Sequence, residues 1–153
     1  MEAVTNIQKP ISSSFDIIKN EKIGYNTGIV VSSSQLTEVY HYSREFITHI
    51  DYKLVSVKLN IPYTGNDGKN RSRIILYLDD EPICDGSIYN SRWELRPIQL
   101  EGIVVNVKTG SHKIKLMCCT DAGNLFIPAF GPDRIENTIK PEIFGKIIII
   151  EMN

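Results

Sequence analysis

Long hydrophobic runs are missing from this chain of 153 residues. Residues 1–20 contain no apolar run long enough for the core of a signal peptide. No later stretch reaches the roughly eighteen consecutive apolar residues that a membrane-spanning helix requires. We therefore expect a soluble protein that has no signal peptide and no membrane contact.

Cysteine is also scarce. The chain has three cysteines, an odd number, so no disulfide framework can use every thiol, and a reducing compartment fits best. Cys118 and Cys119 are adjacent, and adjacent residues of a strand face opposite sides, so at most one thiol points into any pocket. We expect both residues to fill space rather than to act as nucleophiles.

An excess of one charge is absent as well. The 17 Lys and Arg residues balance 18 Asp and Glu residues, which leaves a net charge of −1 and no basic block for nucleic acid or an acidic membrane surface. His41 and Glu45 do not match the ligand spacing of a cupin-type metal site, and no Gly-x-Ser-x-Gly motif occurs. We therefore expect a non-enzymatic protein without catalytic residues, metal or cofactor.

An acidic segment offers the remaining candidate for a cation site. Asp79, Asp80 and Glu81, with Asp85 and Asp67, carry enough carboxylates for calcium, but the fixed ligand spacing of a known calcium loop is missing. A solvated end of a strand explains this charge run more simply.

What the sequence does have is a period near two from Gly28 onward, with many β-branched and aromatic residues, which predicts an all-β domain. Two segments carry the pattern most clearly. Between residues 52 and 61, Val55, Val57, Leu59 and Ile61 share one face and Ser56, Lys58 and Asn60 the other. Between residues 112 and 118, His112, Ile114, Leu116 and Cys118 share one face, with Lys113 and Lys115 toward solvent.

Further strands are expected at residues 28–32, 40–50, 73–78, 83–89, 98–107, 125–127 and 144–152, with a loop over 62–71 and a bulge or bend at Gly102. Eight or nine short strands at regular spacing predict an antiparallel β-sandwich of the jelly-roll type. We assign it to residues 28–153. Residues 1–27 show no clear pattern and are predicted to form an arm or extended segment that docks on a neighbour.

Several short segments resemble the trimeric jelly rolls of the complement C1q and tumour-necrosis-factor type, which also occur in viral capsid-associated and phage tail-fibre proteins. Gly110–Leu116 resembles the turn and strand "G-x-H-x-I-x-L" of such domains, Ala122–Leu125 the following hairpin, and Gly145–Glu151 the closing strand. Leu76–Asp80 is similar to a "vyvDG" strand end. Asp80 stands where the usual residue is Gly. The resemblance spans about half of the chain.

The resemblance implies a C1q/TNF-like fold and self-association. The run Ile147, Ile148, Ile149 and Ile150 does not alternate with polar residues, so it needs cover on both faces, and we expect it to form a trimer interface. The alternative, that it is the central strand of a monomeric sandwich, stays open.

The function that these observations favour is structural. We expect a homotrimeric virion protein, assembled in the cytoplasm, such as a minor capsid, capsid-decoration or fibre-head component that contacts other virion proteins. The alternative is a carbohydrate- or receptor-binding module that contacts a host glycan or receptor. For that alternative the candidate ligand-binding residues are Trp93, Arg92 and Tyr89, because aromatic faces stack on sugar rings.

Overall fold

The computed structural model describes residues 15–24, 28–66, 71–89, 96–127 and 145–152, without the side chains of residues 62, 63 and 89. A single 3₁₀ turn, η1 (Tyr40–Tyr42), accompanies the strands in this part of the chain. The strands are β1 (Phe15–Ile23), β2 (Ile29–Val31), β3 (Thr37–Glu38), β4 (Arg44–Thr48), β5 (Tyr52–Asn66), β6 (Arg71–Leu78), β7 (Glu81–Tyr89), β8 (Arg96–Val107), β9 (Gly110–Thr120), β10 (Leu125–Ile127) and β11 (Gly145–Met152).

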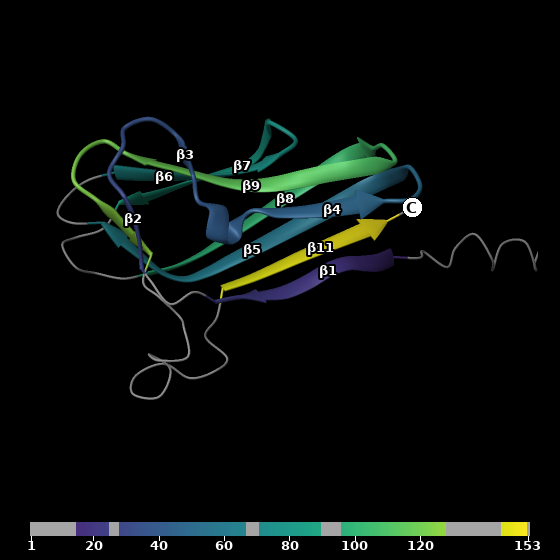
Figure 1. The fold of residues 1–153 in the computed structure, drawn as a ribbon, viewed down its shortest axis with the longest axis horizontal. Helices are drawn as coiled ribbons and strands as arrows, with labels where there is room; N and C mark the ends of the chain where they lie inside the picture. Colours follow the sequence, from purple (N-terminus) through teal and green to yellow (C-terminus); the bar gives the residue numbers. More distant parts are fainter. Residues whose placement is uncertain (1–14, 25–27, 67–70, 90–95, 128–144, 153) are drawn as a thin grey trace, which may run out of the picture.

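These strands form two antiparallel sheets that lie one over the other (Figure 1). Sheet 1 has the order β1-β11-β5-β10-β2, and β8 pairs with β5 on its other side. Sheet 2 has the order β3-β9-β6-β7, and β4 also pairs with β9. The β6–β7 turn joins two neighbours of sheet 2. The chain passes from one sheet to the other between β2 and β3, β4 and β5, β5 and β6, β7 and β8, β8 and β9, and β9 and β10.

The pairing follows one rule along the chain. β1 pairs with β11, β4 with β9, β5 with β8, and β6 with β7, so the outer parts of the chain pair around the inner parts. A long antiparallel hairpin that rolls up in this way gives the two-sheet jelly roll. The predicted fold class, an all-β antiparallel sandwich of the jelly-roll type, is confirmed.

The core lies between the sheets and is built by alternation. Val55, Val57, Leu59 and Ile61 of β5 are fully buried, as the sequence pattern predicted. The same holds for Ile114, Leu116 and Cys118 of β9, which face the core from sheet 2. β11 contributes Ile147 and Ile149, each with 0% of its surface exposed.

Residues 15–23 of the predicted arm or extended segment pair within the same chain. They form β1, which pairs with β11 of the same chain from Phe15 opposite Met152 to Ile23 opposite Gly145. A register shift between Ile17 and Lys19 breaks the alternation, which explains why no pattern was visible in the sequence. Residues 1–14 and 25–27 lie outside the described residues.

Two local predictions in the body also need correction. Part of the expected loop, residues 62–66, continues β5, because the ladder absorbs a register shift between Ile61 and Thr64 at Pro62, a residue without an N–H to donate. No register shift occurs at Gly102. A glycine is required there because a Cβ would lie 2.7 Å from Cδ1 of Ile83, which packs across from sheet 2.

Candidate assembly surface

The outer face of sheet 1 carries apolar side chains in cross-strand rows. Residues directly opposite each other in an antiparallel ladder point to the same face of the sheet. One row crosses four strands as Phe15 (β1), Met152 (β11), Leu54 (β5) and Val105 (β8). The next row is Ile17, Ile150, Ser56 and Ile103. We call these eight residues the apolar face.

Several members of the apolar face are open to solvent. Phe15, Ile17, Ile103 and Val105 are 55–61% exposed, and Leu54, Ile150 and Met152 are half-buried. The four exposed side chains leave on the order of 400 Å² of apolar surface in contact with water, within the range of the largest patch on a typical monomer, which is often functional. The apolar face is therefore a candidate interaction surface.

Polar residues border the apolar face along the sheet. The following rows contain Lys58 opposite Glu101 and then Asn60 opposite Gln99. Nζ of Lys58 lies 3.7 Å from Oε1 of Glu101, so the border includes an exposed ion pair. An apolar centre with a polar rim is the arrangement that protein interfaces have.

The outer face of sheet 2 has a different character. It presents Lys113, whose Nζ lies 3.3 Å from Oε1 of Glu38, and Arg73, whose Nη2 donates to Asp85 across 2.6 Å. Lys115 is paired with Asp80 on the same face. Exposed ion pairs of this kind remain hydrated. The two outer faces of the sandwich therefore differ, since sheet 1 presents apolar rows and sheet 2 presents ion pairs.

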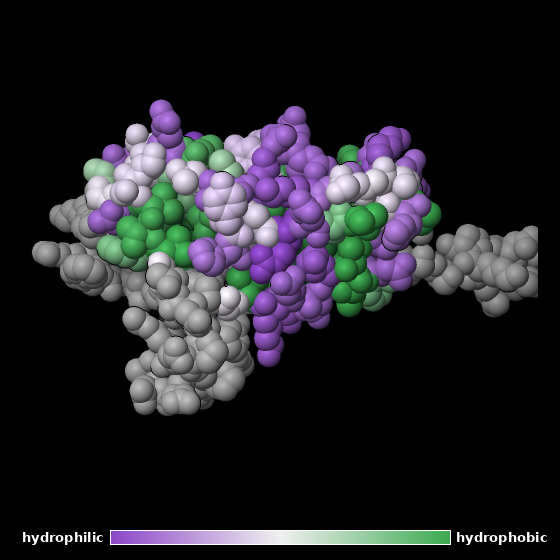
Figure 2. Space-filling model, in the orientation of Figure 1, coloured by the Kyte–Doolittle hydropathy of each residue, from purple (hydrophilic) through white to green (hydrophobic). Residues whose placement is uncertain are grey.

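A shallow groove of about 370 Å³ runs along one side of the sandwich, where β1 and β4 are the edge strands of the two sheets. Lys19, Glu45 and Phe46 are among its lining residues. Nε of Arg44 donates to Glu21 across 3.0 Å between the two edges. In Figure 2, hydrophilic side chains gather in the middle of this side. Charge at exposed edges disfavours strand addition.

The four isoleucines of the predicted interface run divide between the two faces of β11. Ile147 and Ile149 are fully buried in the core of their own chain, so they are unavailable to a partner. Ile148 and Ile150 lie on the outer face of β11 and are half-buried. β11 is an interior strand of sheet 1, so alternate isoleucines serve the core and the outer face. The sequence missed Phe15, Ile17, Ile103 and Val105, because only the strand register brings them together.

The predicted ligand-binding residues do not form a described site. Arg92 and Trp93 lie outside the described residues. Tyr89 is the last residue of β7, opposite Arg71, and its side chain is not described. Of the other tyrosines, Tyr40 is 74% exposed, whereas Tyr42 is fully buried with its ring below Gly145.

The acidic segment forms a turn instead of a cation site. Asp79 and Asp80 are the central residues between β6 and β7, with φ of 49° and 71°. Positive φ at both positions is the geometry of a type I′ hairpin. Asp79 is bonded to His112, and Asp80 to Lys115. Within the described ranges, no three His, Cys, Asp or Glu side chains come together as metal ligands.

Cys118 and Cys119 lie on opposite faces of β9, as the sequence predicted. Cys118 is in the core, and Cys119 is on the other side of the strand. Burial, together with the neighbouring Cys119, raises the pKa of the Cys118 thiol to about 12. A thiol that stays protonated is a poor nucleophile. No helix in the described part of the chain has the length and apolar character needed to cross a membrane.

Comparison with known proteins identifies no family. No protein-family model matches the chain, and no curated protein matches it. Among solved structures, the chain is similar to the CBM36-1 domain of a multidomain xylanase from the hindgut metagenome of Trinervitermes trinervoides, with 14% identity over 93% of this chain and 97% of that one and a TM-score of 0.37.

Two further structures are similar over most of the chain. Eiger TNF from S. frugiperda shares 15% identity over 90% of this chain and 93% of its own, with a TM-score of 0.41. The VP2 subviral particle of infectious bursal disease virus shares 8% identity over 94% of this chain and 37% of its own, with a TM-score of 0.43. Likeness at these levels carries no argument about function. The strand order defines the class, a jelly-roll β-sandwich.

Proposed function

We propose that this chain is a non-enzymatic structural protein of a virion, which assembles as a homotrimer through the apolar face of sheet 1. The exposure of Phe15, Ile17, Ile103 and Val105 carries the proposal. A standard interface buries about 800 Å² on each partner, somewhat more than half of it apolar. The roughly 400 Å² that these side chains expose supplies most of that apolar share.

A closed ring of three copies needs a heterologous contact, in which the apolar face of one copy meets a different surface of the next. The charged outer face of sheet 2 is a poor partner, because its ion pairs would lose water. The resemblance of Gly110–Leu116 and Gly145–Glu151 to trimeric jelly rolls supports a three-fold assembly. These segments are β9 and β11, which lie in different sheets of the sandwich.

Mass in solution tests the assembly. By analytical ultracentrifugation at micromolar concentration, we expect three times the 17.3 kDa of one chain for the wild type. Val105→Lys places a charge on the apolar face and is expected to give monomers. Val30→Lys is the matched control, since Val30 is 56% exposed, as Val105 is 61% exposed, but lies at the far end of the sheet on β2.

A wild-type monomer, or a Val105→Lys variant that keeps the wild-type mass, contradicts assembly through this face. A dimer contradicts the trimer alone. The virion assignment is tested separately, by mass spectrometry of purified particles from the virus that encodes the chain. Absence of the chain from those particles would overturn the assignment.

Carbohydrate or receptor binding is the competing function, and it depends on Arg92, Trp93 and Tyr89. A glycan array with the full chain separates the two proposals. Binding by the wild type that is lost in Trp93→Ala favours the binding module, because the aromatic ring would supply the stacking surface. No binding by the wild type favours the structural role.

A further inference from the structure

His112 lies at one end of the sandwich, where the β6–β7 turn, the β8–β9 turn and β4 meet. Its Nδ1 is 2.5 Å from Oδ2 of Asp79, in the turn between β6 and β7. Its Nε2 is 2.6 Å from the carbonyl oxygen of Lys108, in the turn between β8 and β9. A carboxylate and a carbonyl oxygen only accept hydrogen bonds, so both ring nitrogens must donate. This geometry therefore requires the imidazolium, the charged form of the ring.

The surroundings hold the ring in this position. Phe46 of β4 stacks on it, with ring centroids 5.4 Å apart and an angle of 29° between the planes. The other carboxylate oxygen of Asp79 accepts the backbone N–H of Lys113 across 2.8 Å. The N–H of Asp79 donates to the carbonyl of Lys113 across 3.0 Å. His112 thus connects the β6–β7 turn, the β8–β9 turn and β4.

Within the described residues, the charged partner of the ring among the elements packed against it is Asp79. From the β8–β9 turn, Lys108 offers its carbonyl, while its ammonium lies 3.9 Å from Asp51 in the β4–β5 turn. In the β6–β7 turn, Asp80 is paired with Lys115. From β4, Phe46 contributes an uncharged face.

The balance of these effects favours the charged ring. Burial opposes the imidazolium, but the hydrogen bonds to Asp79 and to the Lys108 carbonyl, with the charge of Asp79, outweigh it and raise the pKa of His112 above its ordinary value of 6.5. A pKa that folding raises adds stability below the unfolded value. That stability is lost as the pH rises through the folded value.

We propose that His112 is a pH-dependent clasp, which as a cation ties the β6–β7 and β8–β9 turns to the end of β4 and on deprotonation releases one of them. A neutral imidazole keeps one N–H, so the other nitrogen then presents its lone pair to an acceptor about 2.6 Å away. Repulsion between the two acceptors opens that side of the clasp.

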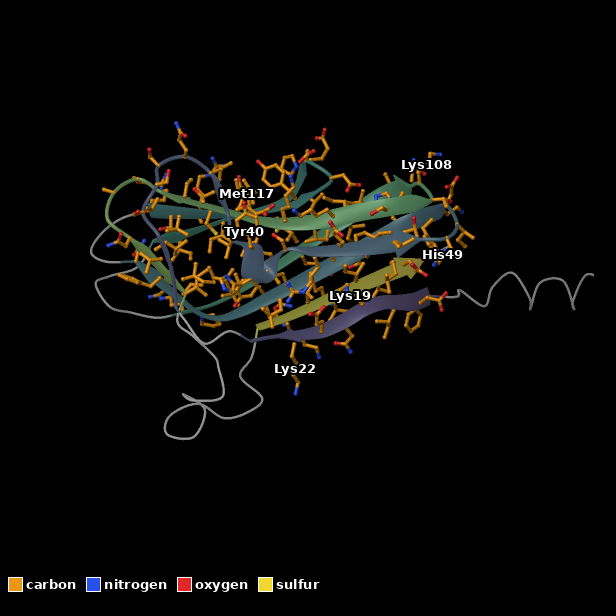
Figure 3. The ribbon with its side chains drawn as sticks, in the orientation of Figure 1. Lys19, Lys22, Tyr40, His49, Lys108 and Met117 are labelled. Carbon is orange, nitrogen blue, oxygen red and sulfur yellow. The ribbon has the colours of Figure 1, made fainter. Side chains whose placement is uncertain are left out.

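The clasp lies at the same end of the molecule as the apolar face. Val105 is followed two residues later by Val107, the last residue of β8, and then by the turn that contains Lys108. Figure 3 labels Lys108 and His49 together at this end. If the proposed trimer forms, release of the turn changes the surface beside Val105, and assembly weakens as the pH rises. This last step rests on the proposed function.

NMR of the ring protons of the full chain tests the clasp directly. We expect the ring of His112 to titrate above the ordinary histidine value of 6.5. We also expect the amide of Lys113 to exchange faster as His112 loses its proton, by more than the base-catalysed rise with pH. If His112 titrates at or below 6.5, the clasp is overturned.

Urea denaturation gives a second readout. Between about pH 6 and pH 8.5 we expect the urea midpoint of the wild type to fall. His112→Gln is expected to lose this fall, and the matched control His49→Gln to keep it. If the urea midpoint of His112→Gln keeps the pH dependence of the wild type, the clasp is contradicted. If that variant does not fold, the ring titration of the wild type decides.

Ultracentrifugation over the same pH range separates the two proposals. A wild type that is monomeric throughout refutes the proposed assembly, while the clasp stands or falls on the titration. If the association constant of the assembly does not change over the pH range in which His112 titrates, only the link between the clasp and the assembly is refuted.

Discussion

Ser56 of β5 lies directly opposite Ile150 of β11 on one side and Ile103 of β8 on the other, all on the outer face of sheet 1. The alternating pattern of β5 predicted that the side chain of Ser56 points away from the core, and the strand register confirms this direction. Yet only 6% of its surface is exposed, because the two flanking isoleucines crowd over it. The small hydroxyl side chain therefore marks the middle of the apolar face.

A charge at this position should act on assembly and spare the fold. In Ser56→Lys, the long side chain reaches past the isoleucines to water in the free chain, so the free energy of unfolding of the monomer should change little. In the assembly the ammonium would be buried without a partner, and we expect association to weaken by about tenfold or more. Sedimentation equilibrium measures the association, and urea denaturation the fold.

Ser87→Lys is the control for this change, because Ser87 is an exposed serine in β7 of sheet 2. It should leave association at the wild-type level. Equal association of the Ser56→Lys variant and the wild type would place the contact elsewhere.

Much of the sandwich could be predicted from local alternation, because each long strand has one buried face. Val55 to Ile61 and Ile114 to Cys118 show this directly. The apolar face could not be found in this way, since it depends on the register of four strands. Phe15 and Val105 belong to one row although 90 positions separate them in the sequence, and β1 itself was hidden by its register shift.

The acidic turn shows a second limit of sequence patterns. A run of Asp79, Asp80 and Glu81 can serve either as cation ligands or as a hairpin turn, because Asp tolerates positive φ better than most residues. The strand register decides between them. It places Leu78 opposite Glu81, so only Asp79 and Asp80 remain to make the turn.

Asp80 is expected to cost stability in this turn. Its φ of 71° suits glycine better, and the exposed ion pair to Lys115 contributes little. We expect Asp80→Gly to raise the melting temperature by about 2 °C. Differential scanning calorimetry measures this. Asp80→Ala removes the ion pair without relieving the backbone, so it should lower the melting temperature, and a rise in that variant would show that φ is not the cause.

Gly102 is expected to be intolerant of a side chain. Its Cβ would lie 2.7 Å from Cδ1 and 2.8 Å from Cγ1 of Ile83, so Gly102→Ala should destabilise the fold by about 1–3 kcal/mol. Ile83→Ala removes both atoms, and the double variant should recover part of the loss that Gly102→Ala causes alone. Urea denaturation of the four proteins gives the coupling.

Gly86 provides a graded comparison in β7, a strand of the facing sheet. There the added Cβ would lie 3.1 Å from a terminal methyl of Leu100, so a shift of a few tenths of an ångström suffices. Gly86→Ala should therefore cost less than Gly102→Ala. The reverse order would mean that Ile83 moves aside more easily than Leu100.

Cys118 should resist thiol reagents as long as the chain is folded. Burial raises its pKa to about 12, so near pH 8 the thiol stays protonated and unreactive. Its side chain is also closed to the reagent, with 0% of its surface exposed.

We expect iodoacetamide to modify Cys119, which is half-buried on the outer side of β9, well before Cys118. Peptide mass spectrometry resolves the two sites in a Cys119→Ser variant and the wild type. In urea both thiols should react alike, because unfolding removes the burial that separates them, and modification of Cys118 at the rate of Cys119 in the native protein would show that this part of the core opens to solvent.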